Sequence, residues 1–239
     1  MSVRVTVRHS ITALVLCGGL GTRLRPVTGD LPKVLAPVAG HPFLHHILRY
    51  LAGQGISDVV LCTGYAAAAV TSYCGDGSWW GIRVRYSHEA EPLGTGGAIK
   101  HAQPLIASDP FLVLNGDSMI RADLAHLVHF HLEKQARISL VITEVSDKMR
   151  FGSVQLAGDG SIDGFSEKGH QGSGLINAGI YLMDRDVLDA ISTGCSASIE
   201  HDLFPRFAGK GLYGMVAAGS FIDIGTPEAH ALAQTALTG

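Results

Sequence analysis

Short apolar runs alternate with segments of helical periodicity along the first 145 residues. The runs typical of buried strands are 11–16, 58–64, 82–87, 111–117 and 136–145. Between them, apolar residues recur at helical spacing in 43–55, 96–103 and 122–134. Because strand–helix–strand units build parallel sheets, this order predicts a parallel sheet with helices on both faces.

The pattern changes after about residue 145. The segment 151–167 predicts a hairpin that turns at Gly158-Asp159-Gly160, and 174–184 predicts another strand. The final segment, 221–237, predicts a strand, a turn and a helix. We therefore expect one α/β domain over residues 1–239, built on a Rossmann-like, mostly parallel mixed sheet. Its first half is 11–145, and a second half, 146–239, adds strands.

Composition narrows the class of protein. Of 239 residues 46% are hydrophobic, which suffices for a sizeable core, and the net charge is −3 with a pI of about 6.4. This balance argues against nucleic acid as a partner. The apolar start at 11–20 is too short and glycine-rich to cross a membrane, and the N-terminus lacks the layout of a signal peptide. We expect a cytoplasmic protein without a membrane partner.

Cysteine and histidine spacing does not suggest a metal centre. Four cysteines form no C-x-x-C pair, and we expect reduced thiols. Two histidine groups fall in helix-like patterns, where packed or solvated side chains are the common outcome. These groups are His45-His46 and His126, His129 and His131.

A glycine-rich loop follows the first strand, in the stretch LCGGLGTRLRPVTGDLPK at 16–33. In open α/β sheets, ligands bind at the carboxyl ends of strands, where this loop begins. Glycines let backbone N–H groups approach an anion, and Arg23, Arg25 and Lys33 would neutralise it. The spacing matches neither the P-loop pattern nor G-x-G-x-x-G. The residues thus predict a polyphosphate site of another kind.

The long form of this loop resembles the signature of sugar-1-phosphate nucleotidylyltransferases. The resemblance continues through EPLGTGGA (91–98), LNGD (114–117), FGSV (151–154), SEK (166–168), NAGIY (177–181) and FIDIGTP (221–227). It implies an enzyme of nucleotide-sugar biosynthesis, with a nucleotide-binding half at 11–145 and a sugar-phosphate-binding half at 146–239. In this reaction a sugar 1-phosphate attacks a nucleoside triphosphate and pyrophosphate leaves.

The resemblance assigns most of the site residues. Arg23, Lys33 and Asp117 are implied as catalytic. The implied nucleotide-binding residues are Leu16, Gly18, Gly19, Gly21, Thr22, Arg23, Gly94 and Thr95. The implied sugar-phosphate-binding residues are Gly152, Glu167, Lys168 and Asn177. The family commonly has proline after the Glu-Lys pair, whereas this chain has Gly169.

Two acidic residues are implied as ligands of Mg²⁺. Asp117 ends a predicted strand, and a carboxylate there suits a hard cation that also takes phosphate oxygens. The resemblance adds Asp223, which lies 106 positions further along the chain. Only the fold can bring the two together, so the pair is a direct test of the interpretation.

The substrate is narrowed by resemblance alone. Within the family, the chain resembles the D-glycero-α-D-manno-heptose 1-phosphate guanylyltransferases, which implies GTP as nucleotide and this heptose phosphate as acceptor. ATP on the same acceptor and a hexose 1-phosphate remain alternatives, as does transfer to phosphocholine or a molybdenum cofactor. A non-catalytic nucleotide-sugar sensor is a further alternative from another class. The oligomeric state stays open, a homo-oligomer included.

Overall fold

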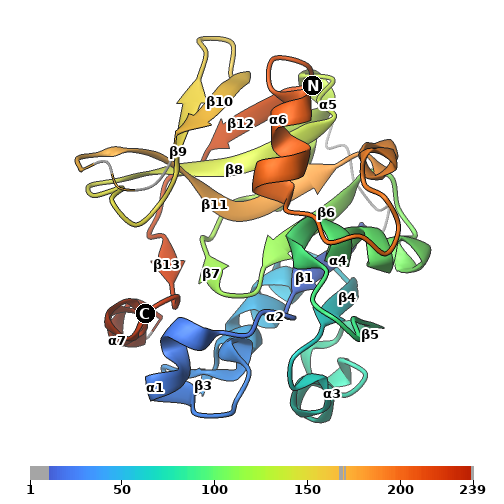
Figure 1. The fold of residues 1–239 in the computed structure, drawn as a ribbon, viewed down its shortest axis with the longest axis vertical. Coiled ribbons are helices and arrows are strands. Elements are labelled where there is room, and N and C mark those ends of the chain that lie inside the picture. The colour runs from blue at the N-terminus through green and yellow to red at the C-terminus, as the bar shows by residue number, and fades with distance from the viewer. Residues whose placement is uncertain (1–10, 167–168, 170, 238–239) are drawn as a thin grey trace, which may run out of the picture.

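The computed structural model describes residues 11–166, 169 and 171–237, and its framework is a nine-stranded sheet (Figure 1). Seven strands follow the order β10-β9-β11-β6-β1-β4-β5, and β8 pairs with both β11 and β12. Their bounds are β1 Thr12–Leu16, β4 Asp58–Thr63, β5 Arg83–His88, β6 Phe111–Asn115, β8 Ile138–Val145, β9 Ser153–Leu156, β10 Ile162–Ser166, β11 Gly174–Met183 and β12 Leu212–Val216.

The four strands β6, β1, β4 and β5 form the parallel part of the sheet. Leu14 of β1 pairs with Val60 of β4 on one side and with Val113 of β6 on the other. Ala13 and Val15 enter one hydrophobic core, whereas Leu14 enters a second core on the opposite face. A strand buried on both faces reads as a continuous apolar run, which is why the sequence predicted these strands.

Helices cover both faces of this sheet. One core is shared by α2 (Phe43–Gly53), α3 (Ala67–Cys74), α5 (Leu124–Glu133) and α7 (Pro227–Ala236). The other contains α4 (Gly94–Ala102), α6 (Phe204–Phe207) and the π-helical turn Ile199–Leu203. The predicted α/β class with a mixed sheet is confirmed, and the helices at 43–53 and 94–102 begin or end within two residues of their expected bounds.

The second half of the chain extends the sheet with mostly antiparallel strands. β11 runs antiparallel to β6 and to β8, with a register shift against β8 between Asn177 and Tyr181. β12 joins the other side of β8 in parallel and had no sequence signal, since its five residues LYGMV contain a glycine. β8, from the first half, therefore lies between two strands of the second.

Short elements complete the structure. β7 (Ser118–Met119) pairs antiparallel with β13 (Ile222–Asp223), and β2 (Pro37–Val38) pairs with β3 (His41–Pro42). The loop after β1 contains a 3-10 turn at Thr22–Leu24, the short helix α1 (Arg25–Thr28) and a second 3-10 turn at Lys33–Leu35. Within the described residues, no helix is both long and apolar enough to cross a membrane.

Candidate active site

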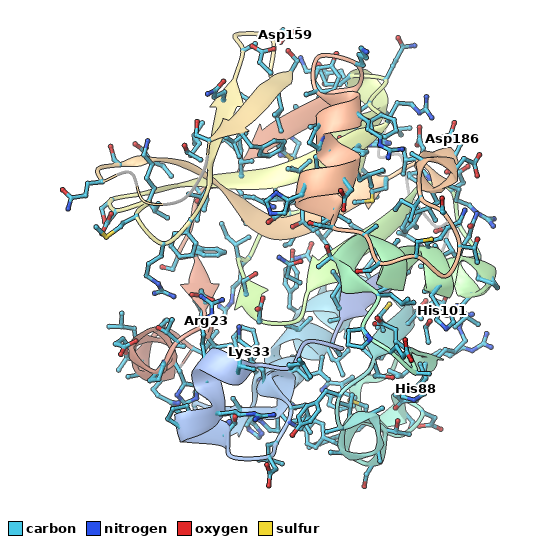
Figure 2. All side chains as sticks on the ribbon, viewed as in Figure 1. Arg23, Lys33, His88, His101, Asp159 and Asp186 are labelled. Atoms are coloured by element: carbon cyan, nitrogen blue, oxygen red, sulfur yellow. The ribbon has the colours of Figure 1, made fainter. Side chains whose placement is uncertain are left out.

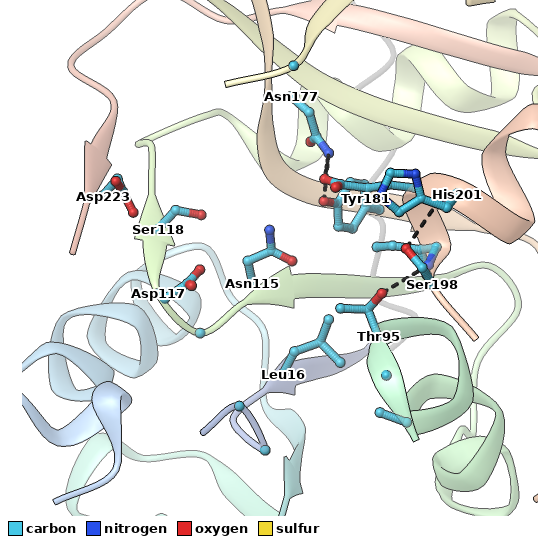
Figure 3. A pocket seen from close by; sticks show the side chains of 18 of the residues that line it. Leu16, Thr95, Asn115, Asp117, Ser118, Asn177, Tyr181, Ser198, His201 and Asp223 are labelled. Atoms are coloured by element: carbon cyan, nitrogen blue, oxygen red, sulfur yellow. Dashed lines mark hydrogen bonds between the residues drawn. The ribbon is translucent and has the colours of Figure 1, made fainter. Parts of the chain in front are cut away.

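A cavity of about 730 Å³ opens where the carboxyl ends of β1, β4, β5 and β6 face the strands of the second half (Figure 3). Ten predicted site residues line it: Leu16, Gly18, Gly19, Arg23, Gly94, Thr95, Asp117, Gly152, Asn177 and Asp223. A smaller cavity of about 320 Å³ shares Gly19, Arg23 and Asp117 with it and adds Gly21, Thr22 and Lys33. Glu167 and Lys168 lie outside the described residues.

The glycines of the loop after β1 are required for close packing. Gly21 has a φ of +58°, and a Cβ there would come within 2.9 Å of the Cβ of Lys33. A Cβ on Gly18 would come within 2.8 Å of a Glu89 carboxylate oxygen, whereas one on Gly19 would meet no atom within 4 Å. The open space over Gly19 is what a backbone that approaches a ligand needs.

The cations of this loop point in different directions. Arg23 and Lys33 both line the smaller cavity, on the side of α1 and α7 (Figure 2). Arg25, which the loop pattern also suggested, lines neither cavity, and its guanidinium lies 5.9 Å from the centre of the half-buried Tyr65 ring. Arg25 begins helix α1, and its side chain packs on Tyr65.

Asp117 and Asp223 meet at the edge of the cavity through the pairing of β7 with β13. Asp223 stands opposite Ser118 in this pairing, and the N–H of Ile224 donates to the carbonyl of Asp117 at 3.0 Å. Gly116 lets the turn after β6 pack on the end of β1, because a Cβ there would come within 2.3 Å of the carbonyl oxygen of Leu16. The fold thus brings together the two acids expected from distant parts of the sequence.

Each of these carboxylates already has a cationic partner. Lys33 Nζ lies 2.7 Å from Asp117 Oδ2, and Arg150 Nη2 donates to Asp223 Oδ2. Asp223 Oδ1 accepts from the N–H of Gly225 at 2.7 Å. Two carboxylates that line one cavity fit a Mg²⁺ site that phosphate oxygens complete. The described residues contain no group of three or more His, Cys, Asp or Glu side chains suited to a metal.

One end of the cavity is built around the start of helix α4. The strap, residues 195–199, packs on this helix: the Ala197 carbonyl accepts from the N–H groups of Gly96 and Gly97 at 2.7 and 3.2 Å. Thr95 Oγ1 accepts from the N–H of Ile199 at 2.9 Å, so this hydroxyl holds the strap. Glu89, which follows β5, is only 7% exposed and accepts from the N–H of Leu93 through Oε2.

The neighbouring wall of the cavity is formed by β11 and the π-helical turn, which continues from the strap. Asn177 Nδ2 donates to Tyr181 Oη at 2.8 Å and to Glu200 Oε1 at 3.1 Å, and its Oδ1 accepts from the N–H of Gly179 (Figure 3). Burial raises the pKa of Tyr181, with the Glu200 charge as a smaller cause, so its hydroxyl stays protonated. Asn177 is therefore oriented by three contacts.

Several lining residues were not identified from the sequence. The main ones are Glu89, Asn115, Arg150, Tyr181 and Glu200. Glu89 follows the carboxyl end of β5, so the rule that ligands bind at strand ends could have found it. Arg150 lies in a loop and Glu200 in the short π-helical turn, and the position of both depends on tertiary packing. Cys62 also lines the cavity, but burial raises its pKa, with the Glu89 charge as the next cause, and disfavours a thiolate nucleophile.

Comparison with known proteins identifies the family. The model of the nucleotidyl transferase family matches residues 12–238. The chain is 41% identical to mannose-1-phosphate guanylyltransferase of Mycobacterium tuberculosis, over 92% of this chain and 62% of the relative. It is 38% identical to D-glycero-α-D-manno-heptose 1-phosphate guanylyltransferase of Aneurinibacillus thermoaerophilus, over 94% of this chain and 97% of the relative. The chain belongs to the nucleotidyl transferase family.

Solved structures agree with this result. The crystal structure of HddC from Yersinia pseudotuberculosis complexed with GMP-PN superposes with a TM-score of 0.85 at 34% identity. The match covers 94% of this chain and 98% of that one. The family and fold implied by the sequence motifs are thus confirmed, whereas the roles of single residues stay predictions.

Proposed function

We propose that the protein transfers GMP from GTP to a sugar 1-phosphate of manno configuration, D-glycero-α-D-manno-heptose 1-phosphate in first place, and releases pyrophosphate. The observation that carries the proposal is that the glycine loop, Arg23, Lys33, Asp117 and Asp223 line two adjoining cavities, which share Gly19, Arg23 and Asp117. A protein that only binds nucleotide sugars has no need of two acids beside a triphosphate site.

In this mechanism, a phosphate oxygen of the sugar phosphate attacks the α-phosphorus in line, and the bond from that phosphorus to the bridging oxygen of pyrophosphate breaks. Both reactants are anions, so the protein must offset their repulsion and hold the line of attack. Arg23 would bind the leaving pyrophosphate, and Lys33 would bridge phosphates once it leaves Asp117. The open backbone at Gly19 would let N–H groups contact the triphosphate.

Asp117 and Asp223 would hold the Mg²⁺ ion, because their carboxylates share the cavity edge where the phosphates would lie. When bound, the ion would neutralise charge on the phosphate oxygens.

The proposed location of the reaction is the cytoplasm, because nucleoside triphosphates are available there. Thiols also stay reduced in the cytoplasm, and the four cysteines of this chain are all free.

Glu89 supports guanine over adenine. Its buried carboxylate lines the cavity beside Gly94, and its Oε1 faces Gly18, where no side chain fits. A carboxylate only accepts hydrogen bonds, and the guanine edge offers donors at N1 and at the 2-amino group. Adenine presents an acceptor at N1, which a carboxylate would repel. The base would therefore lie between Leu16 and the start of α4, with Glu89 at its edge.

The sugar is supported by chemistry that the relatives share. Two relatives, from Aneurinibacillus thermoaerophilus and Campylobacter jejuni, are heptose 1-phosphate guanylyltransferases at 38% and 37% identity, and the Mycobacterium relative is named for mannose. Both sugars present a manno-configured ring to the enzyme. Gly152, Asn177 and Glu200 line the end of the cavity where the ring would lie, and Glu167 and Lys168 are proposed to complete this end.

A pyrophosphate-release assay tests the proposal. The protein is mixed with Mg²⁺, each of five nucleoside triphosphates in turn, and a panel that contains the heptose 1-phosphate, mannose 1-phosphate and glucose 1-phosphate. We expect the highest kcat/KM with GTP and the heptose phosphate. Preference for ATP would overturn the guanine assignment, and preference for a hexose phosphate would overturn the heptose assignment. Release with no pair from folded protein would instead support a nucleotide-sugar sensor.

A further inference from the structure

Arg150 is a cation of the cavity for which the sequence motifs suggested no role. It lies between β8 and β9, directly before Phe151 and Gly152, and all three residues line the cavity. Its guanidinium reaches β13, where Nη2 donates to Asp223 Oδ2. Arg150, which lies next to the proposed sugar-binding residue Gly152, is thus ion-paired with one of the two carboxylates proposed to hold the metal.

Both oxygens of Asp223 are engaged. Oδ1 accepts from the N–H of Gly225 at 2.7 Å, Oδ2 accepts from Arg150, and the side chain is only 15% exposed. Asp117 is similarly paired with Lys33. A divalent cation beside either carboxylate would be repelled by the positive side chain already there. Metal binding is therefore weaker while these side chains have no other anions to bind.

We propose that Arg150 is a substrate-binding residue that moves from Asp223 to a non-bridging oxygen of the sugar 1-phosphate when this substrate binds. The inference rests on the proposed function, which supplies the acceptor. The Arg150 side chain is 43% exposed, so it can turn without disrupting a packed core. Its planar guanidinium can bind two phosphate oxygens at once.

The location of Arg150 selects the acceptor phosphate over the triphosphate. Arg23 lines the cavity from the loop after β1, next to the glycines expected to contact the triphosphate. Arg150 lines it from the segment that also contains Gly152, which lies beside β11 because Ser153 pairs with Ile176. Arg150 would then have opposite effects on two ligands: it weakens metal binding in the free protein and strengthens binding of the sugar phosphate.

The test compares Arg150→Gln and Arg150→Lys with Arg83→Gln, a control at an exposed position on the edge strand β5. Mn²⁺ binding without substrates is followed by electron paramagnetic resonance. We expect Arg150→Gln to bind Mn²⁺ about 5-fold tighter than wild type or more, within the usual range of coupling between ligands. Arg150→Lys, which keeps the charge, and the control should stay near wild type.

Calorimetry then measures binding of the heptose 1-phosphate and of mannose 1-phosphate with Mg²⁺, and of GTP with Mg²⁺. Arg150→Gln should weaken binding of the sugar phosphate by about 10-fold or more, since a charge-assisted contact is lost, while GTP with Mg²⁺ should bind at least as tightly as it does to wild type. In turnover, the same variant should raise KM for the sugar phosphate.

Two results would overturn the inference: unchanged affinity of Arg150→Gln for the sugar phosphate, or Mn²⁺ affinity equal to that of wild type. Both are read without turnover, so they are distinguishable from failure of the proposed function, which is absence of pyrophosphate release from wild type. Wild-type protein that binds neither sugar phosphate would overturn the role of Arg150 as well. The melting temperature of each variant shows that it is folded.

Discussion

At the scale of single residues, the site is a set of polar groups whose partners are already in place. Asn177 is held by Tyr181, Glu200 and the N–H of Gly179. The Glu89 carboxylate accepts a hydrogen bond from the N–H of Leu93, and Lys33 donates to the Asp117 carboxylate. Side chains restrained in this way lose little conformational entropy when a ligand binds, which favours affinity. The most informative substitutions are therefore those that change one hydrogen-bonding pattern and keep the shape.

Glu89→Gln is such a substitution. The carboxamide keeps an oxygen for the N–H of Leu93 but adds a donor, which suits N1 of adenine and opposes N1–H of guanine. We expect the ratio of kcat/KM for GTP to that for ATP to fall by about 10- to 100-fold, as for loss of one hydrogen bond to a charged group. Steady-state pyrophosphate release with both nucleotides measures this ratio.

Glu91→Gln is the matched control, since Glu91 is exposed two positions along the same loop. It should leave the ratio unchanged. A Glu89→Gln enzyme with the nucleotide preference of wild type would remove Glu89 from base recognition.

At the scale of elements, the start of α4 depends on the strap, residues 195–199. Ala197 exchanges hydrogen bonds with this helix, because its N–H donates to the Leu93 carbonyl and its carbonyl accepts from Gly96 and Gly97. This close approach explains why LGTGGA (93–98) has glycine at positions 94, 96 and 97, where a side chain would collide with the strap. A Cβ on Gly94 would come within 2.6 Å of the Ala197 carbonyl oxygen, and the φ of Gly94 is +69°. The motif reflects packing as much as ligand contact.

Gly94→Ala should consequently destabilise the whole protein. A left-handed conformation and a backbone clash together should lower the free energy of unfolding by about 2–4 kcal/mol. Urea unfolding followed by circular dichroism measures the change.

Gly53→Ala serves as the comparison, because Gly53 ends α2, is exposed, and has open space where a Cβ would be. It should be neutral or stabilise by about 0.5–1 kcal/mol, as alanine is the better helix former. Equal effects of the two substitutions would contradict the packing at the strap.

At the scale of the whole molecule, the two halves of the sequence share one sheet. β6 of the first half pairs with β11 of the second, and β8 lies between β11 and β12. The strap binds α4, and β13 binds β7. The residues that line the cavity come from both halves of the chain, so the cavity forms only when both halves are folded. Figure 1 shows how the strands of the two halves join in one sheet.

This sharing predicts a single cooperative unfolding transition. Trp79 and Trp80, the two tryptophans, lie in the first half, whereas far-UV circular dichroism reports on both halves. The urea midpoints from fluorescence and from circular dichroism should coincide. Two separate transitions would show that 11–145 and 146–239 are independent folding units.

The sequence by itself determined the parallel core and the list of site candidates. Strands buried on both faces must be apolar runs, and loops at their carboxyl ends carry the polar residues, so 11–16, 58–64 and 111–117 were visible locally. Thirteen of the 15 residues implied by the resemblance lie among the described residues, and all 13 line the two cavities, whereas Arg25, suggested by the loop pattern, lines neither. Their roles stay predictions. Apolar strands and the polar loops that follow them are visible in the sequence because they depend on residues that are neighbours in the chain.

Only the tertiary structure decided which distant residues meet. β12, the strap and the β7–β13 pairing depend on hydrogen bonds between segments far apart in sequence, which leave no periodic pattern. The partners of Asp223, Asn177 and Thr95, as well as the direction of Arg25, follow from that packing. The sequence alone could therefore name Asp117 and Asp223, but their meeting required the sheet to form first.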